Sequence, residues 1–146
     1  MRIMGLDIGS QTIGVAISDE MGVTAQGLKT LRRKSKEEDF KEIHALIMKF
    51  EIGKIVVGLP KNMDGTLGKQ AEMIFNWIKA TQKRIHFPMV TWDERLSTVG
   101  ATQVLLEADL SRKKRKKVID KLAAVLILQG YLDHSRKRSH ASRFQV

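Results

Sequence analysis

Apolar and polar positions recur with two different periods along the chain, and the change of period separates strands from helices. Three apolar stretches near the N-terminus, residues 2–8, 12–18 and 25–33, have the pattern of strands. Because only short turns separate them, they are predicted to form an antiparallel meander. From Ser35 the period becomes helical, and Glu38 follows this candidate N-cap at the spacing of a capping box.

The remainder of the chain alternates apolar strands with amphipathic helices. Residues 54–60 are almost continuously apolar, which is typical of a parallel strand covered on both faces. The further elements expected are a helix over 69–82, a strand over 88–95, and two final helices over 98–108 and 118–134. This order predicts an α/β fold in which one five-stranded mixed sheet carries helices on both faces, with the first strand at its centre.

Length and composition limit the class of protein. The chain has 146 residues, the length of one domain, which is expected to cover residues 1–138 and to leave 139–146 as a disordered basic tail. The absence of Cys excludes disulfides and thiolate zinc sites. No apolar run approaches the ~18 residues that span a bilayer, and the N-terminus lacks a signal-peptide core. We therefore expect a cytoplasmic protein without a membrane partner.

Positive charge is the main feature of the composition. Lys and Arg together number 26 against 16 Asp and Glu, which gives a net charge of +10. Such an excess favours a polyanionic partner, nucleic acid first, although a basic surface without a partner is the simpler alternative. One basic run separates the last two predicted helices, and we interpret it as a contact to the nucleic-acid backbone rather than a solvated linker. Its residues are Arg112, Lys113, Lys114, Arg115, Lys116 and Lys117.

The first strand contains an acid, Asp7, where strands rarely carry one. Burying an unpaired carboxylate is costly, so this position favours a use for the negative charge. Gly5 and Gly9 flank Asp7 on the same face of the strand and leave room beside its carboxylate for a metal or a phosphate. The alternative is that Asp7 caps the turn over residues 9–12 through its side chain.

Two more acids occupy positions from which they can reach the same place. Glu94 ends a predicted parallel strand, and sites in open α/β sheets form at the carboxyl ends of such strands. Asp120 aligns with Ala124 and Ile127 on a mostly apolar face of the last helix, which indicates that it is not fully outward. The alternatives are an ordinary polar strand end for Glu94 and a surface pair with a neighbouring lysine for Asp120.

Asp7, Glu94 and Asp120 come from three separate elements and can converge near the end of the central strand. Their mutual repulsion would raise the pKa of at least one of them. Mg²⁺ or Mn²⁺ would remove that conflict, because these ions prefer oxygen ligands. Two such ions can hold a scissile phosphate between them, so the three acids are candidate metal ligands and catalytic residues. The basic surface would then hold the polyanion that is cut.

Further candidate contacts to nucleic acid flank these acids. The guanidinium of Arg95 matches phosphate oxygens, although an ion pair with Asp93 or Glu94 is an equal alternative. Lys61 precedes a polar loop over residues 62–68 that we interpret as a flap on the substrate side. A plain surface connection is the default alternative for this loop.

Four ordered blocks of the sequence resemble one protein family. They are "GLDIGSQTIGVAISD", "IVVGLPKNMDGT", "TWDERLST" and "VIDKLAAVLIL". Together they resemble the YqgF or RuvX proteins of the RNase H-like superfamily, which are relatives of the RuvC-type Holliday junction resolvases, over the chain to about residue 134. The resemblance implies an RNase H-like fold and an acidic metal site at Asp7, Glu94 and Asp120. Members of the family are described as Holliday junction resolvases and as nucleases that mature the precursor of small-subunit (16S) ribosomal RNA.

Two rival functions stay open at the level of sequence. The first block also resembles the phosphate-binding turn of the actin, Hsp70 and sugar-kinase ATPases, in which Asp7 would serve Mg-ATP; those folds use two such domains. A nucleic-acid-binding module without catalysis would also explain the basic surface. The sequence does not decide between ribosomal RNA or its particle and branched DNA as partner, or between monomer and dimer.

Overall fold

Short turns between apolar strands bring five strands into one mixed sheet, in the order β3-β2-β1-β4-β5. The strands are β1 (Arg2–Ile8), β2 (Thr12–Ser18), β3 (Ala25–Arg32), β4 (Ile52–Leu59) and β5 (Met89–Asp93). The predicted central position of the first strand is confirmed, because β1 pairs antiparallel with β2 and parallel with β4. β2 and β3 pair antiparallel, and β4 and β5 pair parallel, so β1, β3, β4 and β5 all run in the same direction. The side of the sheet at which these four strands end is called the carboxyl edge here.

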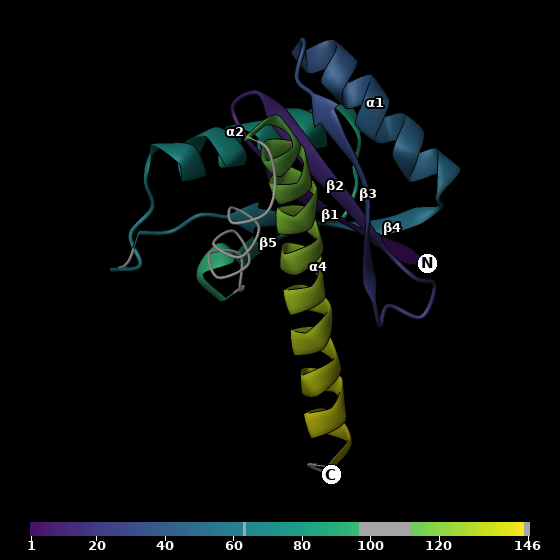
Figure 1. The fold of residues 1–146 in the computed structure, drawn as a ribbon. Coiled ribbons are helices and arrows are strands. Elements are labelled where there is room, and N and C mark those ends of the chain that lie inside the picture. The colour runs from purple at the N-terminus through teal and green to yellow at the C-terminus, as the bar shows by residue number, and fades with distance from the viewer. Residues whose placement is uncertain (63, 97–111, 145–146) are drawn as a thin grey trace.

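The computed structural model describes residues 1–62, 64–96 and 112–144, with 112–121 and 139–144 as helical backbone only. Its helices are α1 (Lys36–Lys49), α2 (Lys69–Arg84) and α4 (Arg112–Phe144), with a single 3₁₀ turn, η1 (Glu94–Leu96). α4 crosses the sheet and its C-terminal half extends beyond it (Figure 1). No helix in the described part of the chain is both long and apolar enough to cross a membrane.

Local signals explain where the first helix begins. The Oγ of Ser35 accepts a hydrogen bond of 3.2 Å from the backbone N–H of Glu38, so the predicted N-cap is confirmed. Acidic residues fill the first turn and Lys49 lies in the last turn, which complements the helix dipole at both ends.

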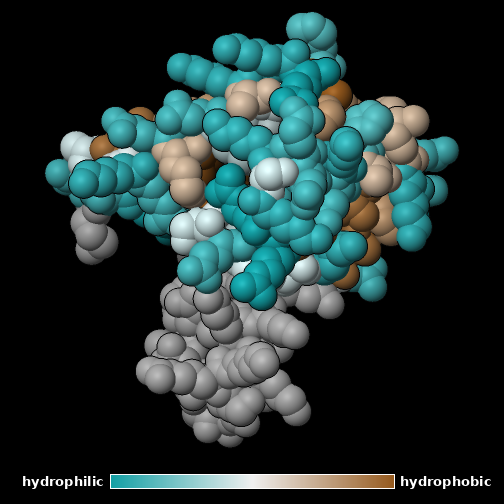
Figure 2. All heavy atoms as spheres, turned by 90° about the horizontal axis from the view of Figure 1, so that it is seen from above, coloured by the Kyte–Doolittle hydropathy of each residue, from teal (hydrophilic) through white to brown (hydrophobic). Residues whose placement is uncertain are grey.

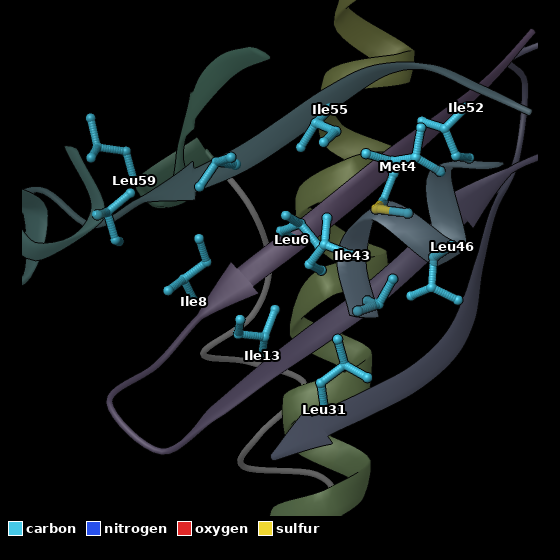
Figure 3. Close-up of a cluster of buried hydrophobic side chains, with 14 of the residues drawn as sticks. Met4, Leu6, Ile8, Ile13, Leu31, Ile43, Leu46, Ile52, Ile55 and Leu59 are labelled. Carbon is cyan, nitrogen blue, oxygen red and sulfur yellow. The ribbon is translucent and has the colours of Figure 1, made fainter. Parts of the chain in front are cut away.

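One face of the sheet, the α1–α2 face, carries a closed apolar core. Met4, Leu6 and Ile8 of β1 are fully buried there. They belong to one cluster with Ile43 of α1 and Ile74 of α2. Figure 3 shows the side chains of β1 lying among those of neighbouring strands and of α1. Burial on this face supplies mainly apolar contact, and the two buried polar side chains of its helices, Asp39 and Thr81, both have hydrogen-bond partners.

The opposite face, the α4 face, is built around glycine. A Cβ atom placed on Gly5 would lie 2.7 Å from the Cβ of Leu128 and 3.2 Å from the carbonyl oxygen of Ala124. Only a residue without a side chain therefore lets α4 lie this close to β1. Ala124 and Leu128 are fully buried in a second, smaller cluster on this face.

The structure differs from the sequence prediction at the last helix. α4 begins at Arg112, so the basic run 112–117 forms its first turns instead of a linker. No Gly or Pro interrupts residues 112–129, and Lys and Arg favour helix. The helix was predicted to start later because the basic run lacks the apolar periodicity on which that prediction relied. Residues 139–144, predicted to be disordered, continue the same helix. The helix predicted over 98–108 lies outside the described residues.

Candidate functional site

The candidate site lies at the carboxyl edge of the sheet, on the α4 face, where β1, β4 and β5 end. Leu6 of β1 pairs with Val57 of β4, so Asp7 lies beside Gly58. Gly58 in turn pairs with Trp92 of β5. The pairing therefore sets the ends of the three strands side by side.

Glu94 occupies the space above Gly58. A Cβ atom on Gly58 would lie 2.9 Å from Oε1 of Glu94 and 2.4 Å from Cδ1 of Ile127 in α4. Glycine at this position thus leaves room for the carboxylate of Glu94 and for the contact with the helix. The carboxylate consequently lies between the end of β4 and α4.

The electrostatics show that Asp7 and Glu94 act on each other. The pKa of Glu94 is raised to about 7, first by burial, then by the negative charge of Asp7, and then by that of Asp93. Burial raises it because a charge loses solvation, and the neighbouring carboxylates raise it because like charges repel. Two interacting acids at one edge of a sheet form a place where a cation would be favoured.

The third acid, Asp120, has only its backbone described, so its side chain lies outside the described part. Ile127 lies over Gly58 near the end of β4, whereas Tyr131 accepts a 3.0 Å hydrogen bond from Nζ of Lys54 near its start. α4 therefore runs antiparallel to β4, and its earlier turns, with residue 120, lie toward the carboxyl edge. Among the described side chains, no three His, Cys, Asp or Glu residues form a metal-binding group.

Asp93 holds the two cations predicted beside the acids. Nε and Nη2 of Arg95 donate to its carboxylate at 3.1 and 2.8 Å, and Nζ of Lys61 lies 4.0 Å from Oδ2. The hydrogen bonds from Arg95 lower the pKa of the Asp93 carboxyl. The ion pair foreseen as an alternative for Arg95 is therefore present, and it keeps this guanidinium at the carboxyl edge.

The loop after β4 is a hydrogen-bonded turn attached to Arg95. The N–H of Asn62 donates to the carbonyl of Thr66, and Gly65 donates back to Asn62, each at 2.9 Å. Oδ1 of Asp64 accepts from the N–H and hydroxyl of Thr66 at 3.0 and 2.6 Å. Nη1 of Arg95 donates to the Asn62 carbonyl at 3.4 Å. The loop that we interpret as a flap is thus joined to the end of β5.

Sequence reasoning did not find Arg33, which joins the site to the other face. Its Nη1 donates to the carbonyl of Gly9 at 3.0 Å, only two residues beyond Asp7. Nothing local in the sequence indicates this contact, because the two residues are 24 positions apart. The sequence did indicate that Gly58 ends a parallel strand beside the expected site, but not that it leaves space for the carboxylate of Glu94.

The side chains of the basic run 112–117 are outside the described part, so its predicted contact with nucleic acid stays a prediction. Its backbone forms the start of α4, which lies toward the carboxyl edge because α4 runs antiparallel to β4.

A family model described as RuvX, Holliday junction resolvase, matches residues 1–134. This chain belongs to the RuvX family. A relative from Clostridium acetobutylicum, named "Putative pre-16S rRNA nuclease", is 56% identical over 133 residues, 91% of this chain and 98% of the relative. A relative from Halothermothrix orenii with the same name is 58% identical over 137 residues, 94% and 98% of the two chains.

Solved structures of resolvases share the fold of this RuvX family member. A Thermus thermophilus RuvC in complex with a Holliday junction substrate aligns with a TM-score of 0.58 and 14% identity, over 94% of this chain and 96% of the other. The yeast mitochondrial Holliday junction resolvase Ydc2 aligns with a TM-score of 0.61 and 12% identity, over 97% and 82%. The RNase H-like fold implied by the resemblance is therefore confirmed.

Proposed function

We propose that this protein is a divalent-metal-dependent nuclease that hydrolyses phosphodiester bonds in structured nucleic acid. The observation that carries the proposal is the pair of acids at the carboxyl edge, Asp7 and Glu94, with the glycine that makes room for them. Membership of the RuvX family and the nuclease names of relatives that match almost the whole chain support the same reaction class.

Asp7, Glu94 and Asp120 are the proposed metal ligands. A dication fits the described pair, because the pKa of Glu94 is raised first by burial and then by the charge of Asp7, and a bound cation would stabilise the ionised form against both. Oxygen donors without Cys suit Mg²⁺ or Mn²⁺, and the number of ions is proposed as two. When bound, such ions activate water and stabilise the leaving oxygen of a phosphodiester.

The cations around the site would bind and orient the substrate. Arg95 and Lys61, both held by Asp93, are proposed to bind phosphate near the cut, since a phosphate can share or replace that carboxylate as their partner. The basic run at the start of α4 is proposed to hold backbone phosphates farther away. Glu94, with a pKa of about 7, would hold a proton part of the time at neutral pH in the metal-free protein.

We propose the precursor of 16S ribosomal RNA, processed at its 5′ end, as the substrate. The names of relatives at 54–58% identity support this choice. A Holliday junction is the second candidate, supported by the description of the family and by the RuvC neighbour bound to such a junction. We propose a cytoplasmic location because the substrate is found there.

The test is a cleavage panel with purified protein on precursor 16S RNA, a four-way DNA junction, duplex DNA and single-stranded RNA, each with Mg²⁺ or Mn²⁺. We expect cutting that needs metal and is lost in Asp7→Asn, while binding is kept. Glu20→Gln is the matched control, because Glu20 is an exposed acid whose ion pair with Arg2 is 4.0 Å long. Full activity in excess EDTA or in Asp7→Asn would contradict the proposal. Binding without any cutting by the wild type would favour the non-catalytic module, and ATP turnover without cutting would favour the ATPase.

A further inference from the structure

A groove lies between α1 and α2, on the face of the sheet opposite the candidate site. Its volume is about 440 Å³, within the range of small-ligand pockets. Cationic and aromatic side chains dominate its lining. They are Arg33, Lys36, Lys69, Arg84, Phe40 and Trp77.

The charge of the groove favours an anion. Four of its lining side chains are cationic and only Glu72 is acidic. Arg84 is paired with Glu37, whereas Lys36 and Lys69 present exposed ammonium groups. The surface on the side where α1 and α2 lie is mostly hydrophilic with small apolar patches (Figure 2). A polyanion would therefore meet a positive surface around a small apolar hollow.

Arg33 connects the groove to the candidate site around the carboxyl edge. Its guanidinium is held between Oδ2 of Asp39, 3.4 Å from Nε, and the carbonyl of Gly9, 3.0 Å from Nη1. Its side chain is 19% exposed and also lines the groove. Since Gly9 follows Asp7 by two residues, Arg33 lies between the candidate site and the groove, where a nucleic-acid strand running from one to the other would meet it.

The aromatic side chains suit a nucleobase. Phe40 and Trp77 are half-buried and line the same groove. The guanidinium of Arg84 lies 5.5 Å from the centre of the Phe40 ring, which fixes that ring against α2. Bases pack on aromatic faces with little dependence on sequence, so a nucleic acid would use both the cations and the aromatic lining of this groove.

We infer that this groove binds a single-stranded segment of the nucleic-acid substrate, about one nucleotide with its phosphates, after the strand has passed around the carboxyl edge from the candidate site. The inference rests on the proposed function for the existence of a nucleic-acid substrate, and it adds a second binding site on the other side of the sheet. Lys36 and Lys69 would hold phosphates, and the ring of Trp77 would form the wall against which the base packs. The ring of Phe40 stacks with His44 and lies under the guanidinium of Arg84, so it supports this wall from the side of α1.

The test measures binding alone, in an Asp7→Asn background without Mg²⁺, to an RNA hairpin with a single-stranded overhang and to the same hairpin with a blunt end. The groove variant carries both Lys36→Ala and Lys69→Ala. The control variant carries both Lys41→Ala and Lys79→Ala, which remove the same charge from the same two helices outside the groove. We expect the first pair to raise the Kd for the overhang about tenfold and to reduce its salt slope by about 1.4. The control pair and the blunt hairpin should change less than twofold.

A second readout uses tryptophan fluorescence. The chain has two Trp, so Trp92→Phe leaves Trp77 as the emitter. We expect an oligonucleotide of single-stranded RNA to quench this emission; a DNA oligonucleotide of the same sequence shows whether the groove distinguishes the two sugars.

Three results would each contradict binding in the groove. They are an equal loss of RNA affinity in the control pair, an equal loss of affinity for the blunt hairpin, and no quenching of Trp77 emission. These outcomes are separate from a failure of the proposed function, because they do not depend on cleavage. A wild-type protein that binds the overhang through the groove but cuts none of the substrates in the cleavage panel would refute the nuclease and leave the groove standing.

Discussion

The two faces of the sheet use the same strands for different purposes. On the α1–α2 face, alternate residues of β1 are large and apolar and meet α1 and α2 in a closed core. On the α4 face, the intervening positions are Gly5 and Asp7, and Gly58 of the neighbouring strand lies beside them. The first face carries the larger cluster of buried apolar side chains, and the second has glycines that let a helix and the carboxylate of Glu94 approach the backbone.

Stability and function are separable within a single strand. Leu6 and Asp7 are neighbours in sequence, yet their side chains lie on opposite faces of the sheet because the side-chain period of a strand is two. Substitution of the buried apolar side chains should therefore lower mainly the free energy of unfolding, and substitution of the acids should lower mainly cleavage.

The largest expected effect on stability is at the apolar face. Leu6→Ala removes a fully buried side chain and leaves a cavity, so the free energy of unfolding should fall by about 2–5 kcal/mol. Urea unfolding measures this change. The control is Leu67→Ala at an exposed position, expected to change stability by less than about 0.5 kcal/mol. Equal losses at both positions would contradict the assignment of the core to this face.

Gly58→Ala tests the crowded α4 face. The new methyl group would meet Ile127 and the carboxylate of Glu94, so we expect a loss of about 1–3 kcal/mol in stability and a larger loss in cleavage, because Glu94 must move. Gly53→Ala in the same strand is the matched control, since its methyl group would meet only the flexible side chain of Met1. Cleavage that survives Gly58→Ala unchanged would count against Glu94 as a ligand.

The pH dependence of stability tests the environment of Glu94, where burial comes first and the charge of Asp7 second. The folded-state pKa of Glu94, about 7, is above its ordinary value of 4.5, so its contribution to stability is present below about pH 4.5 and is lost as pH rises through 7. Because Glu94 is partly exposed, the loss in metal-free protein should be only about 1–2 kcal/mol.

Glu94→Gln should remove this part of the pH profile and be the more stable protein at pH 8 in EDTA. Added Mg²⁺ should stabilise the wild type at pH 8 more than it stabilises the variant. Unfolding in urea between pH 4.5 and 8 measures both effects. If the wild type and the Glu94→Gln variant had parallel profiles of stability against pH, the pKa of Glu94 would not be raised in the folded protein.

The smallest expected effect is at the start of α1, away from the site. Ser35→Ala removes the N-cap hydrogen bond to Glu38 and should cost about 1 kcal/mol, with no change in cleavage by the folded protein. Ser35→Asp should restore most of the loss, because Asp also caps helices well. A decrease in cleavage with Ser35→Ala would show that the two faces are coupled.

The elements and their order followed from local patterns. Alternation in β1, the continuous apolar run of β4 and the cap at Ser35 each depend on neighbours within a few residues, so sequence reasoning located them to within about two positions. The start of α4 was predicted too late, because the prediction relied on apolar periodicity. A run of Lys and Arg that no Gly or Pro interrupts can be helical without an apolar face. The last turns of α4 continue where disorder was expected for the same reason.

By itself, the sequence determined the five-stranded α/β architecture, the central place of β1, and the types of residue that could form an acidic site. Only the tertiary structure decided that Glu94 lies over Gly58 beside Asp7, that Asp93 holds Arg95 and Lys61, and that Arg33 reaches Gly9. The physical reason is range: periodicity and capping act between neighbours along the chain. The Asp93–Arg95 pair is local and was foreseen as an alternative, but the contacts of Glu94 with Gly58 and of Arg33 with Gly9 join residues dozens of positions apart. These contacts exist only once the strands have paired and α4 has packed on the glycines.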